Sequence, residues 1–243
     1  MSADRYISSH TQFEAYRDTP TGTGAGAGTG DVGAAILAGG HSTRMGTDKA
    51  LLRAWPGGPA MIEMVAARLL EAGLPPALLV TNTPERYAFL GLRMVPDDLP
   101  GAGPLGGILT ALVHSPLPRV LVVACDMPLL NPDLLRYMAS LPDDADAIVP
   151  RHAGLEDTAA LRPEPLHAIY SRRCIEPIRR RLERRGGKIP LGSGSVVSLL
   201  GELNVKYVEE DELRAHDPYL LSFRNINTPQ EWAEYLRDLG HVW

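Results

Sequence analysis

From Val32 onward, short apolar runs alternate with longer segments whose apolar residues recur at helical spacing. The apolar runs predict strands at Val32–Leu37, Ala77–Thr81, Leu92–Pro96, Val120–Cys125 and Ala147–Pro150. The segments between them predict helices at Ala60–Ala72, Pro104–His114 and Pro132–Ser140. The fourth of these runs is apolar throughout, which is typical of a strand covered on both faces. The alternation predicts an α/β fold with a mostly parallel sheet, whose ligands bind beyond the carboxyl ends of the strands.

After Pro150 the alternation is weaker. The pattern there predicts two short strands and an arginine-rich helix, at Thr158–Leu161, Leu166–Tyr170 and Arg172–Arg185. A last strand is expected near Ser222–Ile226, before a helix that begins at Thr228-Pro229 with threonine as its N-cap and proline in its first turn. Because no linker or repeat divides these segments, we expect residues 31–243 to form a single domain.

The first thirty residues have little apolar patterning and end in a tract rich in Gly, Ala and Thr. Such a tract loses much backbone entropy on ordering and has little apolar surface to bury, so residues 1–30 are expected to be a flexible leader. A G-x-G-x-x-G match at Gly28, Gly30 and Gly33 overlaps the end of this tract. The match precedes the first predicted strand instead of following one, so it lacks the context of a dinucleotide-binding loop.

Composition places the chain among ordinary globular proteins. Of its 243 residues, 44% are hydrophobic and 22% are charged, and the formal net charge is −5. Nucleic-acid-binding domains are usually basic, so no nucleic-acid partner is expected. The N-terminus lacks a signal-peptide pattern and no apolar run approaches the ~20 residues that cross a bilayer, so we expect a cytoplasmic protein without a membrane contact. The two cysteines, Cys125 and Cys174, cannot form a disulfide framework or a cysteine-based metal site.

Candidate chemistry begins directly after the first predicted strand, where residues 37 to 49 read Leu-Ala-Gly-Gly-His-Ser-Thr-Arg-Met-Gly-Thr-Asp-Lys. Glycines allow backbone N–H groups to approach a phosphate closely, and Arg44 and Lys49 can neutralise a triphosphate. The segment is not a Walker loop, because it contains no Gly-Lys-Ser/Thr. The alternative interpretation is a glycine-rich surface loop whose charges are incidental.

These residues resemble the signature of the molybdenum cofactor guanylyltransferase family, the MobA-like nucleotidyltransferases. That family has L-A-G-G, then R-M-G, then D-K, and all three occur here in matching order and spacing, at Leu37–Gly40, Arg44–Gly46 and Asp48–Lys49. Further matches lie downstream, at Gly103–Gly107, Cys125–Pro128 and Asn225–Pro229. The leader before Asp31 has no counterpart in the family pattern.

The resemblance implies a Rossmann-like three-layer nucleotidyltransferase fold with a mostly parallel sheet. It also implies a reaction in which GMP is transferred from GTP to the phosphate of the molybdenum-molybdopterin cofactor, with release of pyrophosphate and formation of molybdopterin guanine dinucleotide. Besides GTP and the molybdenum-molybdopterin cofactor, the implied partners are proteins that donate molybdopterin and acceptor molybdoenzymes, both in transient contact.

The resemblance also assigns roles to particular residues. The expected nucleotide contacts are Leu37, Ala38, Gly39, Gly40, Lys49, Asn82, Asp97 and Asp126. The expected catalytic residues are Asp126, Lys49 and Arg44. For the contact with the base, Asp97 is preferred to the adjacent Asp98 because of its spacing to Gly103.

Asp126 directly follows the most apolar predicted strand, at the edge where ligands of a parallel sheet bind. Phosphoryl-type transfer requires neutralisation of phosphate charge, which Mg²⁺ provides when one or two carboxylates hold it. The family resemblance makes Mg²⁺ the cofactor and Asp126 its ligand. The alternative role for Asp126 is a helix cap, although Asn131 before Pro132 already supplies a good one. Asn227 belongs either to the metal or acceptor side or to the turn before the last helix.

Two other features have a structural interpretation as well as a functional one. Cys125 lies in an apolar strand, so we expect it to contribute to packing. The basic segment from Arg172 to Lys188 is either a solvated helix face with internal ion pairs or an electropositive rim for the pterin phosphate or a donor protein.

Three rival functions remain open. The G-x-G-x-x-G string at Gly101–Gly106 follows a predicted strand, precedes a helix and has Asp126 about twenty residues later, as a nicotinamide-dependent oxidoreductase requires. That reading leaves the segment Leu37–Lys49 unexplained. A second rival is a CTP-dependent molybdopterin or sugar-phosphate nucleotidyltransferase, although the cytidylyl relatives typically have L-A-A-G instead of the L-A-G-G found here. A third is a catalytically silent GTP-binding regulator, against which Lys49 and Asp126 count.

Overall fold

The computed structural model describes residues 30–39, 48–53, 57–74, 76–153, 160–184, 194–226, 228 and 230–234. The predicted leader lies outside these residues, except for Gly30. Among the described residues, no helix is long and apolar enough to span a bilayer.

The described strands form one mixed sheet. They are β1 (Val32–Leu37), β2 (Pro76–Val80), β3 (Met94–Val95), β4 (Arg119–Ala124), β5 (Ala147–His152), β6 (Arg162–Pro163), β7 (His167–Ser171) and β8 (Val205–Glu209). Their order is β3-β2-β1-β4-β7-β5-β6, and β8 pairs with β5. Strands β3, β2, β1 and β4 are parallel, β7 runs antiparallel to both β4 and β5, and β8 is parallel to β5. The prediction of a mostly parallel sheet is confirmed.

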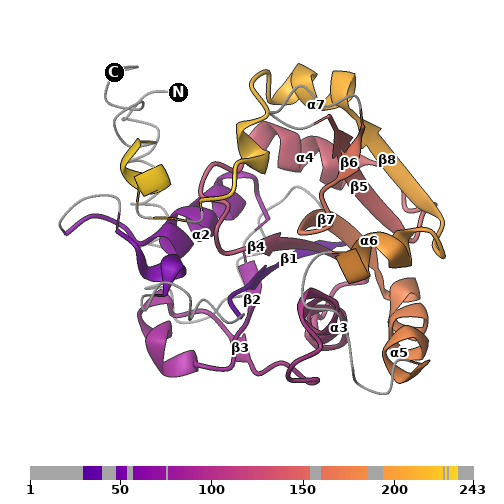
Figure 1. Cartoon of the computed structure of the whole chain (residues 1–243), viewed down its shortest axis with the longest axis horizontal. Coiled ribbons are helices and arrows are strands. Elements are labelled where there is room, and N and C mark those ends of the chain that lie inside the picture. Colours follow the sequence, from indigo (N-terminus) through magenta and orange to yellow (C-terminus); the bar gives the residue numbers. More distant parts are fainter. Residues whose placement is uncertain are drawn as a thin grey trace.

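Helices cover both faces of this sheet. They are α2 (Met61–Glu71), α3 (Pro104–His114), α4 (Pro132–Ser140), α5 (Ile175–Arg184), α6 (Gly194–Leu200) and α7 (Glu210–His216). Short 3₁₀ turns are η2 (Lys49–Leu51), η3 (Pro84–Arg86), η4 (Ala88–Leu90), η5 (Arg172–Cys174) and η6 (Leu221–Phe223). Figure 1 shows α3 and α5 below the sheet and α4 and α7 above it.

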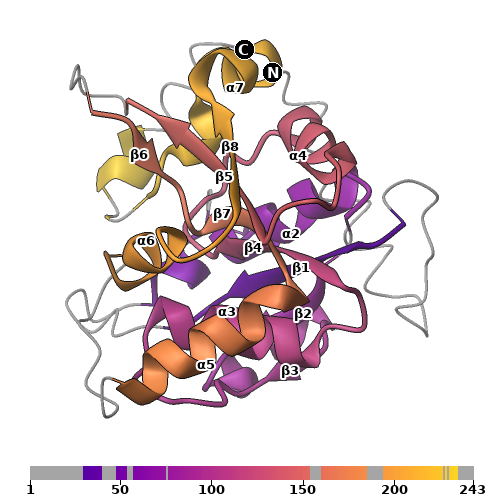
Figure 2. The ribbon, with the colours of Figure 1, turned by 90° about the vertical axis from the view of Figure 1, so that its right-hand side faces the viewer.

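Each face of the sheet has its own hydrophobic core. One core joins apolar side chains of α2, α4 and α7 to β1 and β4, and the other joins those of α3, α5 and α6 to the opposite face of the same strands. Figure 2 shows the helices from the side, with α3 and α5 together below the sheet and α4 and α7 above it. The arrangement is a three-layer α/β/α fold, as predicted. Strand β4 lies between β1 and β7, and Val120, Leu121, Val122 and Val123 are at most 1% exposed, which explains why this run is apolar throughout.

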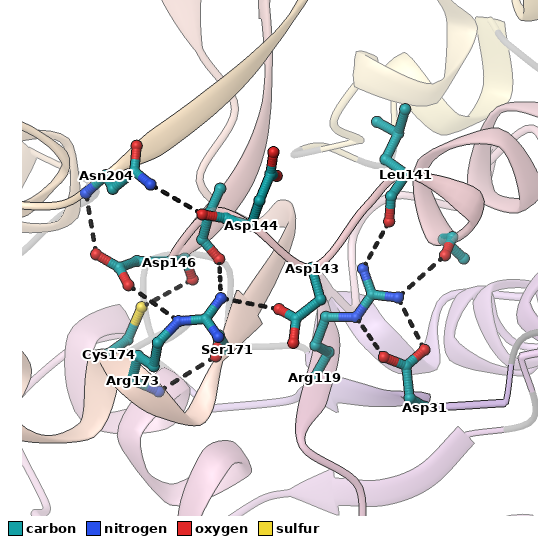
Figure 3. Close-up of polar contacts among 12 residues, drawn as sticks. Asp31, Arg119, Leu141, Asp143, Asp144, Asp146, Ser171, Arg173, Cys174 and Asn204 are labelled. Atoms are coloured by element: carbon teal, nitrogen blue, oxygen red, sulfur yellow. Dashed lines mark hydrogen bonds and ion pairs between the residues drawn. The ribbon is translucent and has the colours of Figure 1, made fainter.

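The beginning of β1 is fixed by an arginine in the neighbouring strand (Figure 3). The guanidinium of Arg119 donates to both carboxylate oxygens of Asp31, at 2.9 and 2.8 Å. A further donor of the same side chain reaches the carbonyl of Leu141, at the end of α4, at 2.9 Å. Arg119 therefore ties the starts of β1 and β4 to the end of α4.

The second half of the chain departs from the prediction. Strand β6 lies at Arg162–Pro163, directly after the predicted strand Thr158–Leu161, whose first two residues lie outside the described part of the chain. A two-residue edge strand needs no alternating apolar pattern, and an edge tolerates a proline that cannot donate to the ladder. The strand predicted near Ser222–Ile226 is also wrong: the chain forms η6 and then an irregular segment, held where the N–H of Ser222 donates to the Asp217 carboxylate at 2.8 Å. Strand β8 and helices α6 and α7 were not predicted.

Candidate active site

Backbone hydrogen bonds align the carboxyl ends of the four parallel strands. The N–H of Ala38, after β1, donates to the carbonyl of Val80 in β2 at 2.9 Å, and the N–H of Cys125, after β4, donates to the carbonyl of Leu37 at 3.2 Å. The N–H of Thr81 donates to the carbonyl of Val95 in β3 at 2.9 Å. The predicted residues that follow these strands therefore lie along one edge of the sheet, where parallel sheets bind ligands.

At this edge a lysine and an aspartate that are far apart in the sequence form an ion pair. Lys49 is the first residue of η2, and Asp126 follows β4. Lys49 Nζ lies 2.6 Å from Asp126 Oδ2, and the two side chains are 22% and 15% exposed. The fold thus brings together two predicted catalytic residues that are 77 positions apart.

The donor set around Asp126 fits a metal ion that takes most of its ligands from a substrate. Among the described residues there is no group of three or more His, Cys, Asp or Glu side chains that could hold a metal. Mg²⁺ commonly uses one or two protein carboxylates and completes its shell with phosphate oxygens and water. A single partly buried carboxylate at the ligand-binding edge is compatible with that mode of binding.

The two adjacent aspartates after β3 have different surroundings. The backbone N–H of Asp97 donates to Asn82 Oδ1 at 2.9 Å, which joins two of the predicted nucleotide contacts. Oδ1 of Asp97 accepts from the Leu99 N–H at 3.1 Å and from the Thr110 hydroxyl at 3.3 Å, while its Oδ2 has no partner among the described residues. Burial raises the pKa of the Asp97 carboxyl above its ordinary value. Asp98 instead has its carboxylate 2.9 Å from the ring of His114, at the end of α3.

Glycines of α3 allow this edge to be compact. A Cβ at Gly106 would lie 2.7 Å from Cβ of Ala102 and 3.1 Å from Asp97 Oδ1, and a Cβ at Gly107 would lie 3.0 Å from Leu37 Cδ1. The glycines of the G-x-G-x-x-G string that precede α3, Gly101 and Gly103, have φ angles of +86° and +65°, which glycine adopts without strain. Gly106 therefore leaves room for Asp97 and Ala102 beside the first turn of α3.

Several predicted residues lie outside the described part of the chain. They are Gly40, Arg44 and Asn227. Ile226, which precedes Asn227, donates its N–H to the carbonyl of Asp126 at 3.0 Å, so the C-terminal segment reaches the candidate metal ligand. Asn131 is the N-cap of α4, as predicted, and its side chain accepts from the N–H of Asp133 at 2.9 Å. Cys125 packs against the core, and burial raises the pKa of its thiol, which disfavours the reactive thiolate.

The arginine-rich segment is occupied by intramolecular contacts wherever its side chains are described. Arg173 contacts Asp143 at 2.8 Å and Asp146 at 3.2 Å (Figure 3), and Arg181 pairs with Glu202. Arg179 pairs with Glu176 at 3.0 Å, one turn away in α5. These contacts favour the interpretation of a solvated, self-paired helix face.

The sequence did not indicate a role for Tyr87, which lies between η3 and η4. Its hydroxyl donates to Asp48 Oδ2 at 2.6 Å, and Asp48 directly precedes Lys49 in the chain. No motif marks this tyrosine, because its contact with the site depends on how the β2–β3 connection folds back.

Comparison with known proteins agrees with this geometry. A family model described as the MobA-like NTP transferase domain matches residues 34–196. A probable molybdenum cofactor guanylyltransferase from Pelotomaculum thermopropionicum is 40% identical over 214 residues, which cover 86% of this chain and 96% of that protein.

Solved structures show the same fold. Molybdopterin-guanine dinucleotide biosynthesis protein A from Archaeoglobus fulgidus superposes with a TM-score of 0.66 at 27% identity, covering 86% of this chain and 99% of that one. The 2-C-methyl-D-erythritol 4-phosphate cytidylyltransferase from Thermus thermophilus gives a TM-score of 0.62 at 17% identity, with 86% and 99% coverage, and so shares the fold. Because the family model and the relatives match most of its length, this chain belongs to the MobA-like nucleotidyltransferases, in the molybdenum cofactor guanylyltransferase family.

Proposed function

We propose that the protein transfers GMP from GTP to the phosphate of the molybdenum-molybdopterin cofactor, releasing pyrophosphate and forming molybdopterin guanine dinucleotide. The observation that carries this proposal is the Lys49–Asp126 pair, at 2.6 Å, on the carboxyl edge of a nucleotidyltransferase sheet. The chain's family membership and the names of its relatives support the choice of substrates.

In this proposal GTP lies along the carboxyl ends of β1 to β4. Backbone groups of Leu37, Ala38 and Gly39 would contact the nucleotide, with Gly40 and Arg44 contributing from the connection that follows. Gly39 is exposed, and a Cβ placed on it would meet no atom of the described residues within 4 Å, which supports an approach of a ligand to its backbone. Lys49 would bind the triphosphate, because its ammonium is already fixed at this edge.

Asp97 would read the guanine base. A carboxylate can accept two parallel hydrogen bonds from the N1–H and the exocyclic amino group of guanine, and neither cytosine nor adenine offers that pair of donors. Oδ2 of Asp97 has no partner among the described residues and would accept one of these bonds, while Oδ1 would accept the other in addition to those from Leu99 and Thr110. The side chain of Asn82 fixes the backbone of Asp97. Asp98 is less suited, because its carboxylate faces His114.

The reaction needs no protein nucleophile. An oxygen of the pterin phosphate forms a bond to the α-phosphorus of GTP, the bond from that phosphorus to the bridging oxygen breaks, and pyrophosphate leaves with the bond electrons. The protein's contribution is then the alignment of the two phosphates and the placement of positive charge. Asp126 would hold Mg²⁺, which when bound neutralises charge on the phosphate oxygens.

The test is nucleotide selectivity with the pterin acceptor. Purified protein is given molybdenum-molybdopterin and GTP, CTP or ATP, and both pyrophosphate and dinucleotide are quantified. We expect GTP to be preferred by roughly tenfold to a hundredfold, since a carboxylate that a bound base shields from water and leaves unpaired costs about 1–3 kcal/mol. Equal turnover with CTP would identify a cytidylyltransferase, and turnover only with a sugar phosphate as acceptor would exclude the pterin reaction. GTP binding without pyrophosphate release would identify a silent regulator.

The setting of the reaction is part of the same proposal. We expect it to take place in the cytoplasm, with transient contacts to proteins that supply molybdopterin and to the molybdoenzymes that receive the product.

A further inference from the structure

Lys49 stands on an element that has little stability of its own. Turn η2 is a single turn of 3₁₀ helix, and such turns have poor hydrogen-bond geometry. The side chain of Asp48 caps this turn, since its Oδ1 accepts from the N–H of Ala50 at 3.2 Å. The direction in which η2 presents Lys49 therefore depends on where the Asp48 carboxylate is held.

A tyrosine from another part of the chain holds that carboxylate. The hydroxyl of Tyr87 donates to Asp48 Oδ2 at 2.6 Å, and Arg86 Nη1 lies 3.5 Å from the same oxygen. The Arg86 side chain is 54% exposed, so its contribution is weakened by water, whereas Tyr87 is 2% exposed. One oxygen of Asp48 caps the turn that carries Lys49, and the other accepts from the buried hydroxyl of Tyr87, 39 positions from Asp48 in the sequence.

Tyr87 is itself anchored on both sides. Its backbone N–H donates to the carbonyl of Pro84 at 3.0 Å, and its carbonyl accepts from the N–H of Leu90 at 2.9 Å. Its ring belongs to the core that also contains side chains of α2. Burial and the bond to Asp48 raise the pKa of the phenol, so it remains a hydrogen-bond donor throughout the neutral range.

We propose that Tyr87 is a positioning residue for Lys49, acting through Asp48 to fix the turn from which the lysine reaches the nucleotide-binding edge. The inference deepens the function proposed above and rests on it, because there Lys49 binds the triphosphate. The hydroxyl of Tyr87 is engaged by Asp48, so in this proposal its effect passes through the turn that carries the lysine.

The chain supplies a matched control. The hydroxyl of Tyr137, in α4, also donates to a carboxylate at 2.6 Å, namely Oε1 of Glu212 in α7. The substitutions Tyr87→Phe and Tyr137→Phe therefore remove the same kind of hydrogen bond and keep both rings. Only the first is connected to Lys49.

The first readout follows Lys49 directly and needs no enzymatic turnover. The chain has only three lysines, Lys49, Lys188 and Lys206, so acetylation of each can be followed by peptide mass spectrometry. Lys49 is 22% exposed and paired with Asp126, which slows its reaction. We expect Tyr87→Phe to speed acetylation of Lys49 several-fold relative to Lys206, and Tyr137→Phe to leave that ratio unchanged.

The second readout separates positioning from general stability. Tyr87→Phe should raise the KM for GTP by roughly tenfold, the scale of a hydrogen bond to a charged group, with a smaller change in kcat. In a Lys49→Ala background the same substitution should have no further effect on KM, because the residue it acts through is gone. Thermal unfolding of each variant shows whether a change in stability accompanies the change in KM.

Two results would overturn the inference. One is equal acetylation of Lys49 in the Tyr87→Phe and Tyr137→Phe proteins. The other is a Tyr87→Phe effect on KM that is as large with Lys49→Ala as without it. If Tyr87→Phe does not fold, Asp48→Ser replaces it, since serine still caps η2 but removes the acceptor of the tyrosine hydroxyl. Failure of the wild-type protein to transfer GMP would count against the proposed function alone, because the acetylation result decides the positioning role without it.

Discussion

Lys49 and Asp126 contact each other, but replacing each should have a different kinetic consequence. Asp126→Asn should lower kcat by roughly 10²–10³-fold, as loss of one electrostatic stabiliser does, and should weaken the magnesium dependence while much of the GTP affinity remains. Lys49→Ala should impair GTP binding and turnover together, because its charge serves both the ground state and the transition state. Steady-state kinetics at several magnesium concentrations and direct GTP titration measure both effects. Near-normal turnover of Asp126→Asn with unchanged magnesium dependence would remove Asp126 as the metal ligand.

The two aspartates after β3 offer a similarly matched pair. Asp97→Asn should reduce the preference for GTP over ATP and CTP by about tenfold or more, because an amide cannot accept both guanine hydrogen bonds. Asp98→Asn should leave selectivity unchanged, because that side chain is engaged with His114 at 2.9 Å. Competition between nucleotides in the transfer assay measures the preference, and an equal loss in both variants would refute the assignment of Asp97.

The motif residues identified this edge before the structure, but its geometry depends on contacts that motifs do not contain. The L-A-G-G and D-K segments and Asp126 pointed to one edge of a parallel sheet, and the structure places Leu37, Lys49 and Asp126 there. The preference for Asp97 over Asp98 rests on spacing and stays a prediction; the structure shows that the two carboxylates have different partners. Tyr87 could not be predicted, because a lone tyrosine in a polar connection gives no signal of a bond to Asp48.

Some strands and helices could be predicted from the hydrophobic pattern of the sequence, and others could not. The first five strands are where the apolar runs predict them, to within two residues, and α3 and α4 have the predicted bounds, because apolar runs and N-terminal prolines mark them. Strand β8 escaped prediction because most of its residues are only half-buried, so that no apolar run marks it. The segment after α7 has the apolar residues of a strand but is held in a turn, because the backbone N–H of Ser222 donates to the Asp217 carboxylate, and a hydrophobic pattern cannot indicate such a bond.

The start of β1 provides a prediction about pH. The bond from Arg119 lowers the pKa of Asp31, so the folded state binds the proton of this carboxyl more weakly than the unfolded state does. Its stabilising effect is therefore complete above the ordinary aspartate pKa of about 3.9 and is lost as pH falls through the lowered folded pKa. Asp31→Asn should lower the free energy of unfolding at neutral pH by about 1 kcal/mol or less, since Asp31 is 44% exposed, and by less still in strong acid.

Urea unfolding at neutral and at strongly acidic pH measures this difference. Asp133→Asn is the control, because Asp133 is 63% exposed and pairs with the exposed Arg136. A deficit of Asp31→Asn that stays constant across the two pH values would show that the ion pair with Arg119 does not stabilise the fold.

The boundary of the domain is the prediction that concerns the molecule as a whole. Among the described residues the sheet begins at Val32, and Asp31 is bonded to it through Arg119, while the tract before it has little apolar surface to bury. Removal of residues 1–30 should therefore leave the melting temperature and GMP transfer nearly unchanged. A large drop in either quantity after truncation would mean that the N-terminal segment contributes to the domain.

The most direct test of GMP transfer follows the α- and γ-phosphates of GTP into the products. GTP labelled on the α-phosphorus, and separately on the γ-phosphorus, is incubated with the protein, Mg²⁺ and molybdenum-molybdopterin. We predict that the α-label is recovered in molybdopterin guanine dinucleotide and the γ-label in pyrophosphate, in equal amounts, and that Lys49→Ala and Asp126→Asn suppress both. Recovery of the α-label as free GMP, or of the γ-label as inorganic phosphate without dinucleotide, would contradict transfer of GMP at this site.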